Sequence, residues 1–367
     1  MRRFLVYSAI LACAGCVSVE PIGAQEFANI EYLCADWGPA MSLPSKPGEK
    51  PQFSDTEEEI YFLKQVTSFT RKKHLVPDLL SGNTTEDIGH GISIYLCKMK
   101  SDGSGKTDIK ELWKNPNYPI DTKDYSCWMN VNKKTHKIAL SILFTGSDVA
   151  GLWTMNLDGG DLKRIITPTL IEGHLQAIDS PSWTPDGQWI VFAESLRGAG
   201  RGRIAKCDMN GGNPVYFTEG PGDCQSRVSP DGNMIAYVHI GDAITGGLCL
   251  MGIDGTNPHL LQNPDDKRRR NHGGIYPTWS PDGKRLLIIG SGIEVIEVAT
   301  GRRVLSREPV LQGKRGTCGI PQWGRVGFVG STPVGGILFT DSNLERANWI
   351  GSSKLLECAG AKGSCQW

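Results

Sequence analysis

The sequence has no net charge and, beyond its first residues, no long hydrophobic run. Its 367 residues include 39 basic and 39 acidic side chains. Proteins whose main partner is nucleic acid carry a strongly basic surface, so this balance argues against that class. No segment after residue 24 reaches the roughly 18 consecutive apolar residues of a transmembrane helix. We therefore expect a soluble mature chain without a membrane span.

The motifs of common cofactor and catalytic sites are also missing. The sequence lacks Cys-x-x-Cys-His, which attaches haem c, and His-Glu-x-x-His, which binds catalytic zinc. It has no P-loop and no Gly-x-Ser-x-Gly turn. The histidines have no metal-ligand spacing; they are His74, His90, His136, His174, His239, His259 and His272. We expect no haem, metal or other cofactor on this chain and no complete catalytic site, although a site assembled from several repeats stays open.

Uninterrupted segments long enough for helices are rare. The chain contains 45 Gly and 21 Pro, and few windows longer than about ten residues lack one of them. Because Gly and Pro punctuate the chain at turns, this spacing favours many short strands. The composition therefore predicts an all-β fold.

The N-terminus has the charge order of a secretory signal peptide. Arg2 and Arg3 precede an apolar segment, residues 4–15, which is too short to span a bilayer. We expect residues 1–24 to be removed by cleavage after Ala24, which makes the protein an exported one. The alternative is a lipoprotein-type cleavage before Cys16.

Removal of the leader leaves nine cysteines. Exported proteins commonly pair their cysteines, and an odd number leaves at least one free or bonded to another chain. We expect a disulfide between Cys358 and Cys365 within the C-terminal tail, residues 353–367. The sequence does not give the remaining connectivity among Cys34, Cys97, Cys127, Cys207, Cys224, Cys249 and Cys318.

An internal repeat is the strongest signal in the sequence. It reads Trp183-Thr-Pro-Asp186-Gly187 and returns as Ser-Pro-Asp-Gly at 229–232 and 280–283. Each copy runs into an apolar strand, then a third strand, a tight turn and a short fourth strand. Weaker copies open at Trp128 and Trp323, and a first copy lies near residues 59–63. Six copies about 40 to 50 residues apart predict a β-propeller over 57–352, with six blades, or seven if the chain ends add strands.

The segments that flank the repeats are short. Residues 25–56 form an N-terminal extension, in which 29–33 are expected to supply a strand that closes the last blade. Repeat architectures of about 340 residues can form one closed unit, so we expect a single folded domain between the leader and the tail.

Two residue types of the repeat have structural interpretations. In Pro-Asp-Gly, Pro presets φ, Asp binds nearby backbone and Gly accepts a positive φ. The carboxylates of Asp186, Asp231 and Asp282 are therefore turn residues rather than catalytic groups. A tryptophan before the turn can wedge between adjacent blades and bury a large apolar area. The predicted wedges are Trp128, Trp183, Trp279 and Trp323.

Three polar segments depart from the repeat, at residues 64–91, 196–203 and 264–274. Long loops on a propeller often carry docking residues. The alternative is that they are solvated charged loops. The predicted contacts to a partner chain or an anionic ligand are Arg268, Arg269, Arg270, His272, Arg201 and Arg203.

The Trp-Ser/Thr-Pro-Asp-Gly repeat, with Asp-Gly about 20 to 30 residues later, resembles that of TolB-like (WD40-like) β-propellers. As a whole, the chain resembles the haem-free β-subunit family of hydrazine synthases from anammox bacteria, in its length, leader, repeats and the start Tyr32-Leu-Cys34-Ala-Asp36-Trp37. This resemblance implies a complex with partner subunits that carry haem c. Such a complex makes hydrazine from nitric oxide and ammonium with electrons from a cytochrome, in the anammoxosome lumen. The resemblance assigns no site residue to this chain.

Two other functions stay open. The first is a stand-alone periplasmic TolB-like propeller that binds proteins or glycans, although the residues before the first repeat are too few for the N-terminal α/β domain of TolB. The second is a propeller lyase or hydrolase with a site in the central funnel. That site needs His, Tyr, Arg and carboxylates on the inner strands, which read as apolar or small in this sequence.

Overall fold

In a computed structural model, the described part of the chain is built from β-strands. The described residues are 25–44, 46, 48–75, 84–100, 104–115, 125–144, 149–171, 173–196, 201–220, 222–241, 246–265, 272, 275–289, 293–307, 310–311, 314–315, 322–323, 327–329, 332–334, 336–340 and 347–351. Over these ranges no helix is assigned, and none could cross a membrane. The predicted leader and the tail with Cys358 and Cys365 lie outside the described residues. The all-β class is confirmed.

Five antiparallel sheets follow one another along the chain, each with its strands in sequence order. The first sheet contains β1 (Gln25–Ser42), β2 (Gln52–Leu75), β3 (Thr84–Lys100) and β4 (Thr107–Asn115). The second contains β5 (Tyr125–Asn132), β6 (Lys137–Phe144), β7 (Gly151–Asn156) and β8 (Lys163–Ile166). The third contains β9 (Leu170–Ile171), β10 (His174–Trp183), β11 (Trp189–Leu196), β12 (Arg201–Asp208) and β13 (Val215–Tyr216).

The fourth and fifth sheets have four strands each. The fourth contains β14 (Asp223–Val228), β15 (Met234–His239), β16 (Gly247–Gly252) and β17 (His259–Leu260). The fifth contains β18 (Ile275–Trp279), β19 (Arg285–Ile289), β20 (Ile293–Glu297) and β21 (Arg303–Arg307).

The strands after residue 307 are shorter. A three-stranded sheet contains β24 (Gln322–Trp323), β27 (Gly336–Thr340) and β28 (Ala347–Gly351). Two hairpins consist of β22 (Val310–Leu311) with β23 (Lys314–Arg315), and β25 (Gly327–Val329) with β26 (Thr332–Val334). The first five predicted repeats thus each fall in their own sheet, whereas the copy that opens at Trp323 is divided between a three-stranded sheet and a hairpin. The number of blades stays a prediction.

The first strands of successive sheets lie against one another, where β10 counts as the first strand of the third sheet because β9 pairs only with its start, at His174 and Leu175. β1 contacts β5, β5 contacts β10, β10 contacts β14, and β14 contacts β18. β24 contacts β18 and β27 contacts β1, so the three-stranded sheet touches both the fifth sheet and the first. These first strands are the innermost strands of the propeller.

The N-terminal extension differs from its prediction. Residues 29–33 belong to β1, and Asn29 pairs with Thr67 of β2 in the first sheet. The expected closing strand for the last blade is therefore wrong. β2 is long enough to pair with β1 down to Gln25, so the N-terminal strand completes the sheet that directly follows it in sequence.

Two of the predicted wedge tryptophans are buried at contacts between neighbouring sheets. Trp183 is 5% exposed and lies in a cluster that joins Leu152 of the second sheet to Phe192 of the third. Trp279 is 7% exposed and shares a cluster with residues of the fourth and fifth sheets. The wedges therefore seal the contacts between neighbouring sheets.

The prediction for Trp128 is wrong by three positions. Register places Val131 opposite Ile138, just as Trp183 lies opposite Ile190. Val131 is buried in the cluster between the first and second sheets, whereas Trp128 is half-buried. The smaller wedge suits its neighbour, because Tyr61 of β2 fills part of the same space. Trp323 lies in β24, and its side chain is outside the described residues.

The repeated aspartates accept hydrogen bonds within their own turns. Asp186 Oδ1 accepts hydrogen bonds from Thr184 Oγ1 at 2.5 Å and from the Gln188 amide at 3.0 Å. Gly187 adopts a φ of +74° at the corner. The same pattern surrounds Asp231 and Asp282. These hydrogen bonds hold the pKa of the Asp186 carboxyl below its usual range, so it stays charged as a turn acceptor.

We expect Trp279→Ala to lower the free energy of unfolding by about 3 to 5 kcal/mol. The substitution opens a cavity between two sheets and leaves the Arg227 carbonyl without the indole hydrogen bond, which measures 3.0 Å. The half-buried Trp128→Ala is the matched control, with an expected loss of about 1 kcal/mol. Urea unfolding monitored by circular dichroism measures both. Equal losses for the two variants would contradict the wedge assignment.

Candidate functional site

The innermost strands carry polar side chains one position before the wedge. Each of these side chains accepts a hydrogen bond from the backbone N–H of the wedge residue in the next sheet. The bonds run from Val131 N to Asp36 Oδ2 (2.7 Å), from Trp183 N to Asn130 Oδ1 (2.8 Å) and from Val228 N to Ser182 Oγ (3.0 Å). Three consecutive sheet contacts are therefore fastened in the same way.

Asp36 is the charged member of this series. Its carboxylate is buried and also accepts hydrogen bonds from the Trp37 amide at 2.8 Å and from Asn130 Nδ2 at 2.9 Å. Burial raises the pKa of the Asp36 carboxyl, while the hydrogen bonds from the Val131 and Trp37 amides act against that rise.

Arg227 occupies the equivalent position in the fourth sheet. It is 7% exposed, and its guanidinium donates to the Pro181 carbonyl at 2.8 Å. Burial lowers the pKa of Arg227, whereas the negative charges of Asp36 and Asp179 favour its charged form. A buried cation thus lies among carboxylates contributed by the first and third sheets.

A second set of polar residues lies two positions earlier on the innermost strands. Ser180, Gln225 and Tyr276 each adopt a positive φ between 50° and 57° at a β-bulge of their inner strand. Gln225 Oε1 accepts a hydrogen bond from the Tyr276 amide at 2.8 Å. The bulges recur in three consecutive sheets, which indicates a device for fitting the inner strands together.

Asp179 directly precedes the first of these bulges. Its Oδ1 is buried and has no hydrogen-bond partner among the described residues. Burial raises the pKa of the Asp179 carboxyl to about 6, while hydrogen bonding by the Ser180 side chain and the Gln225 amide, and then the charge of Arg227, oppose that rise. This carboxyl is suited to exchange a proton near neutral pH, and its free oxygen can accept a hydrogen bond from a small polar ligand.

The surrounding groups do not complete a catalytic set. Burial raises the pKa of the Cys224 thiol to about 12, which leaves almost no thiolate for nucleophilic attack at neutral pH. Among the described side chains, no three His, Cys, Asp or Glu residues are arranged to hold a metal ion. The centre therefore reads first as a structural polar network, with Asp179 as its one chemically distinctive member.

The predicted interface residues differ in their positions and contacts. Arg203 donates to Glu194 Oε1 at 2.7 Å and lies 3.7 Å over the ring of Tyr216, so its charge is used within its own sheet. His272 is fully buried, and its Nε2 lies 2.7 Å from the Gly301 carbonyl, which makes it a packing residue rather than a docking one. Arg201 begins β12, and its side chain is outside the described residues. Arg268, Arg269 and Arg270 also lie outside them.

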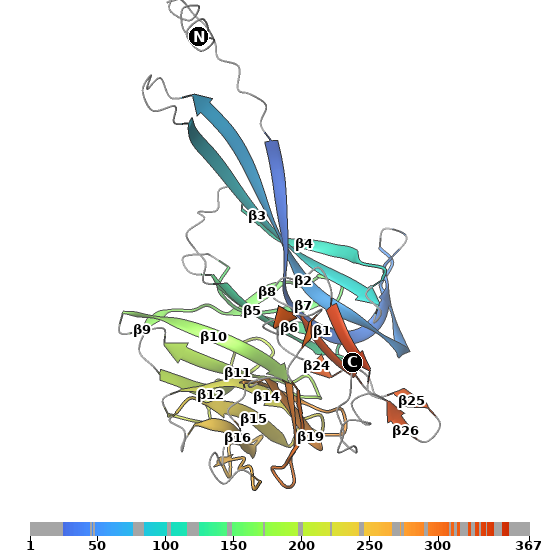
Figure 1. The fold of residues 1–367 in the computed structure, drawn as a ribbon, viewed down its shortest axis with the longest axis vertical. Coiled ribbons are helices and arrows are strands. Elements are labelled where there is room, and N and C mark those ends of the chain that lie inside the picture. Colours follow the sequence, from blue (N-terminus) through green and yellow to red (C-terminus); the bar gives the residue numbers. More distant parts are fainter. Residues whose placement is uncertain are drawn as a thin grey trace, which may run out of the picture.

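The polar insertion expected as a loop over 64–91 is instead an ordered ribbon. β1 pairs with β2 from Gln25 opposite Arg71 onward, and β2 pairs with β3 as far as Leu75 opposite Thr84. Figure 1 shows these three strands projecting together from the other sheets. We call residues 25–28, 68–75 and 84–91 the arm. Sequence inspection missed it because the alternation of apolar residues stops before the strands do.

The register of the arm places basic positions opposite acidic ones. Lys72 lies opposite Asp87, and Lys73 lies opposite Glu86.

The polar residues of the inner strands are the main feature that sequence reasoning missed. Asp36, Asp179, Arg227 and Tyr276 were hidden because each stands in a different repeat at a different distance from its turn motif. Aligning the copies on the wedge would have placed Asp36, Asn130, Ser182 and Arg227 at one position. The expectation that inner strands are apolar or small is wrong.

No protein-family model matches the chain. The Tol-Pal system protein TolB of Francisella tularensis subsp. tularensis is 31% identical over 104 residues, and that of subsp. holarctica matches equally. The aligned region is 28% of this chain and 22% of the TolB chain, so the match spans about a fifth of the curated relatives' length.

Among solved structures, TolB from Acinetobacter baumannii has a TM-score of 0.45 at 13% identity, over 80% of this chain and 82% of that one. A putative TolB from Agrobacterium tumefaciens has 0.43 at 16%, over 66% and 76%. Hydrazine synthase from Kuenenia stuttgartiensis has 0.35 at 15%, over 63% and 73%. The repeat, the successive antiparallel sheets and the 31% identical segment make the chain similar to TolB-like β-propellers.

Replacing Asp179 should change how stability depends on pH. The folded-state pKa of about 6 lies above the unfolded value, so the native protein binds more protons between about pH 4 and 6 and loses stability as pH rises through that window. We expect Asp179→Asn to remove about 2 kcal/mol of this loss and to be more stable than wild type at pH 7.5. Urea unfolding at pH 4.5, 6 and 7.5 tests it, with Asp186→Asn as the exposed control. A pH dependence that is unchanged in Asp179→Asn contradicts a perturbed carboxyl.

Proposed function

We propose that this chain is a non-haem β-propeller subunit of an exported, multi-subunit oxidoreductase of the hydrazine synthase type. Its role in that complex is assembly: it binds and positions partner subunits that carry haem c. The observation that supports this most directly is the arm, a three-stranded ribbon that extends beyond the sheets of the propeller (Figure 1).

The arm has little of its own to pack against. β4 pairs with β3 only between Ile92 and Lys98, so the arm beyond that point consists of three strands. Isolated ribbons of two or three strands are marginally stable in water unless one face is covered, and their outer edges offer unpaired backbone groups. A second chain that covers the arm supplies both the missing surface and edge hydrogen bonds.

Strand direction places other connections on the same side as the arm. The arm is the connection between the second and third strands of the first sheet. In a propeller built from successive antiparallel sheets, the connection between the second and third strands emerges at the same end of every sheet. The Asp186 turn, which joins a first strand to a second, emerges at the other end. A partner on the arm side therefore leaves the turns free.

The segment that carries the resemblance lies at the base of the arm. Cys34, Asp36 and Trp37 all belong to β1, and Trp37 is buried. In this proposal the partner subunits hold haem c, and the complex makes hydrazine from nitric oxide and ammonium in the anammoxosome lumen. The chain itself supplies no haem ligand motif, in keeping with a supporting role.

A second candidate is a stand-alone, periplasmic TolB-like propeller that binds proteins or glycans. The 31% identity to Francisella TolB over 104 residues favours it. The two candidates differ in what they bind, so the same purification separates them.

Purification of the native complex from its source tests the proposal. We expect the chain to co-purify in a fixed ratio with proteins that show the absorption spectrum of haem c, and the assembly to form hydrazine from nitric oxide and ammonium. A stable haem-free monomer would contradict the proposal. Co-purification with an envelope lipoprotein or a glycan, without haem, would favour the TolB-like alternative.

Shortening the arm tests its role within the complex. Ser68 lies opposite Gly91, so residues 69–90 can be replaced by Asn-Gly, which forms a two-residue hairpin turn. We expect the variant to fold with a near-native circular dichroism spectrum and to bind the haem-bearing partners at least ~10-fold more weakly, because most of the contact is removed.

The control is Lys284→Glu, a charge reversal in the turn between β18 and β19 on the opposite side. It should bind the partners as wild type does in the same pull-down or interferometry assay. Undiminished binding by the shortened variant would refute the docking role of the arm while leaving membership of the complex open.

A further inference from the structure

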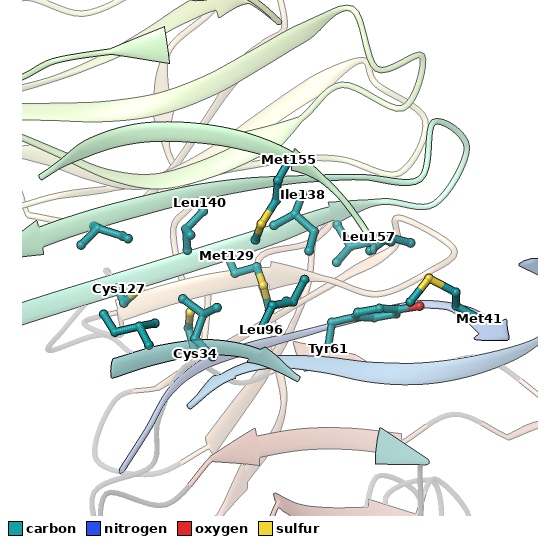
Figure 2. Packing of buried hydrophobic residues seen from close by; sticks show 14 residues of the cluster. Cys34, Met41, Tyr61, Leu96, Cys127, Met129, Ile138, Leu140, Met155 and Leu157 are labelled. Atoms are coloured by element: carbon teal, nitrogen blue, oxygen red, sulfur yellow. The ribbon is translucent and has the colours of Figure 1, made fainter. Parts of the chain in front are cut away.

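Two buried thiols meet where the first and second sheets join. Cys34 lies on β1 and Cys127 on β5, and both are buried, at 5% and 8% exposure. They belong to one hydrophobic cluster together with Met129 and Leu140. Figure 2 shows the two side chains at the same end of that cluster, in the layer between the two sheets.

The contact between these thiols is direct. β1 and β5 are adjacent innermost strands, and the Cys34 side chain is hydrogen-bonded to that of Cys127. Two positions along β1, Asp36 accepts the Val131 amide at 2.7 Å, which fixes how β1 and β5 lie side by side. This hydrogen bond holds β1 against β5 two residues from Cys34, and the shared hydrophobic cluster keeps the two thiols in the same layer.

The other described cysteines lack such a partner. The Cys97 thiol donates to Asp108 Oδ1 at 3.2 Å. No second cysteine lies in the described cluster of Cys207. Cys249 shares a cluster with the partly buried Cys224, but β15 separates their strands, β14 and β16. Two strand spacings of about 4.8 Å each exceed the reach of a disulfide. Of the thiols in the described part of the chain, Cys34 and Cys127 are therefore the pair that geometry brings together.

We propose that Cys34 and Cys127 form a disulfide that joins the arm-bearing first sheet to the second sheet. The oxidant is a low-molecular-weight or protein disulfide, met as the chain folds in an oxidising compartment. One thiolate attacks the oxidant's disulfide, and the second thiolate then displaces the mixed disulfide. In sum, two thiols lose two protons and two electrons, and the oxidant is reduced to two thiols.

Burial sets when this bond forms. Burial, followed by the contact with Cys127, raises the pKa of the Cys34 thiol well above its usual range. In the folded, reduced protein the reactive thiolate is therefore scarce and shielded. The bond should form while the first two sheets are still assembling, and once made it should resist reductants until the chain unfolds.

The bond fastens the part of the molecule that carries the arm. It closes a loop from residue 34 to residue 127 that contains the whole first sheet beyond β1. Without it, Asp36 and apolar packing alone hold β1 against β5. With it, force on the arm is carried to the second sheet through a covalent link.

Peptide mapping of the wild-type chain, refolded in oxidised and reduced glutathione, tests the assignment. Trypsin isolates Cys127 in the peptide 124–133. In the chain expressed without residues 1–24, Cys34 falls in the peptide 25–64, which contains no other cysteine. Free thiols are blocked under denaturing conditions before digestion. We expect a mass that joins these two peptides and disappears on reduction. Recovery of both cysteines as blocked thiols, or of either one linked to a different cysteine, overturns the proposal.

Stability and kinetics provide a second measurement. Reduction should lower the Tm of the wild type by about 5 °C or more and leave the Tm of C34S/C127S unchanged. Cys207→Ser, which removes a buried thiol from another cluster, should keep the wild-type response to reduction. Oxidation of protein that is already folded should be at least ~10-fold slower than during refolding. Equal responses to reduction in wild type and in C34S/C127S would contradict the link.

Discussion

The structure depends on how the innermost strands satisfy their outward-facing backbone groups. Each first strand is an edge of its sheet, so its N–H groups have no partner on that side within the sheet. The side chain just before one wedge binds the wedge N–H of the next sheet, as Asp36 does for Val131. Polar residues on inner strands are thereby explained without catalysis: they join edges that would otherwise be left open.

This constraint also distinguishes polar side chains that have a structural role from a side chain that is available for chemistry. Asn130 and Ser182 have their oxygen atoms engaged, and they differ only in the reach of their side chains. Arg227 stands at the same position but reaches back to the Pro181 carbonyl, because a guanidinium cannot accept an N–H. Asp179 lies outside the scheme, with one buried oxygen unbound. A ligand, if the centre takes one, has that carboxyl as its natural anchor.

The sequence predicts those structural features that depend on neighbouring residues. The Pro-Asp-Gly turn and the wedge at Trp183 and Trp279 follow from short-range chemistry, and both were predictable. Trp128 was misassigned because its copy lacks Pro-Asp-Gly, so only the strand register shows that Val131 is its wedge. The arm was read as a loop because its residues are polar, while its order comes from pairing between distant segments. The meeting of Cys34 and Cys127 likewise depends on two sheets lying side by side, which no spacing reveals.

The strand β1 concentrates these roles in a few residues. Trp37 is buried within its sheet, Asp36 accepts a hydrogen bond from the Val131 amide of the second sheet, and Cys34 interacts with the Cys127 thiol. All three residues lie within positions 34–37. The same strand continues outward as one edge of the arm. Force applied to the projecting ribbon is transmitted to the strands at its base. If apolar packing alone held that base, β1 would be the first strand to separate from β5. The Asp36 hydrogen bond and the proposed Cys34–Cys127 disulfide would together stiffen that base, as the proposed docking of a partner on the arm requires.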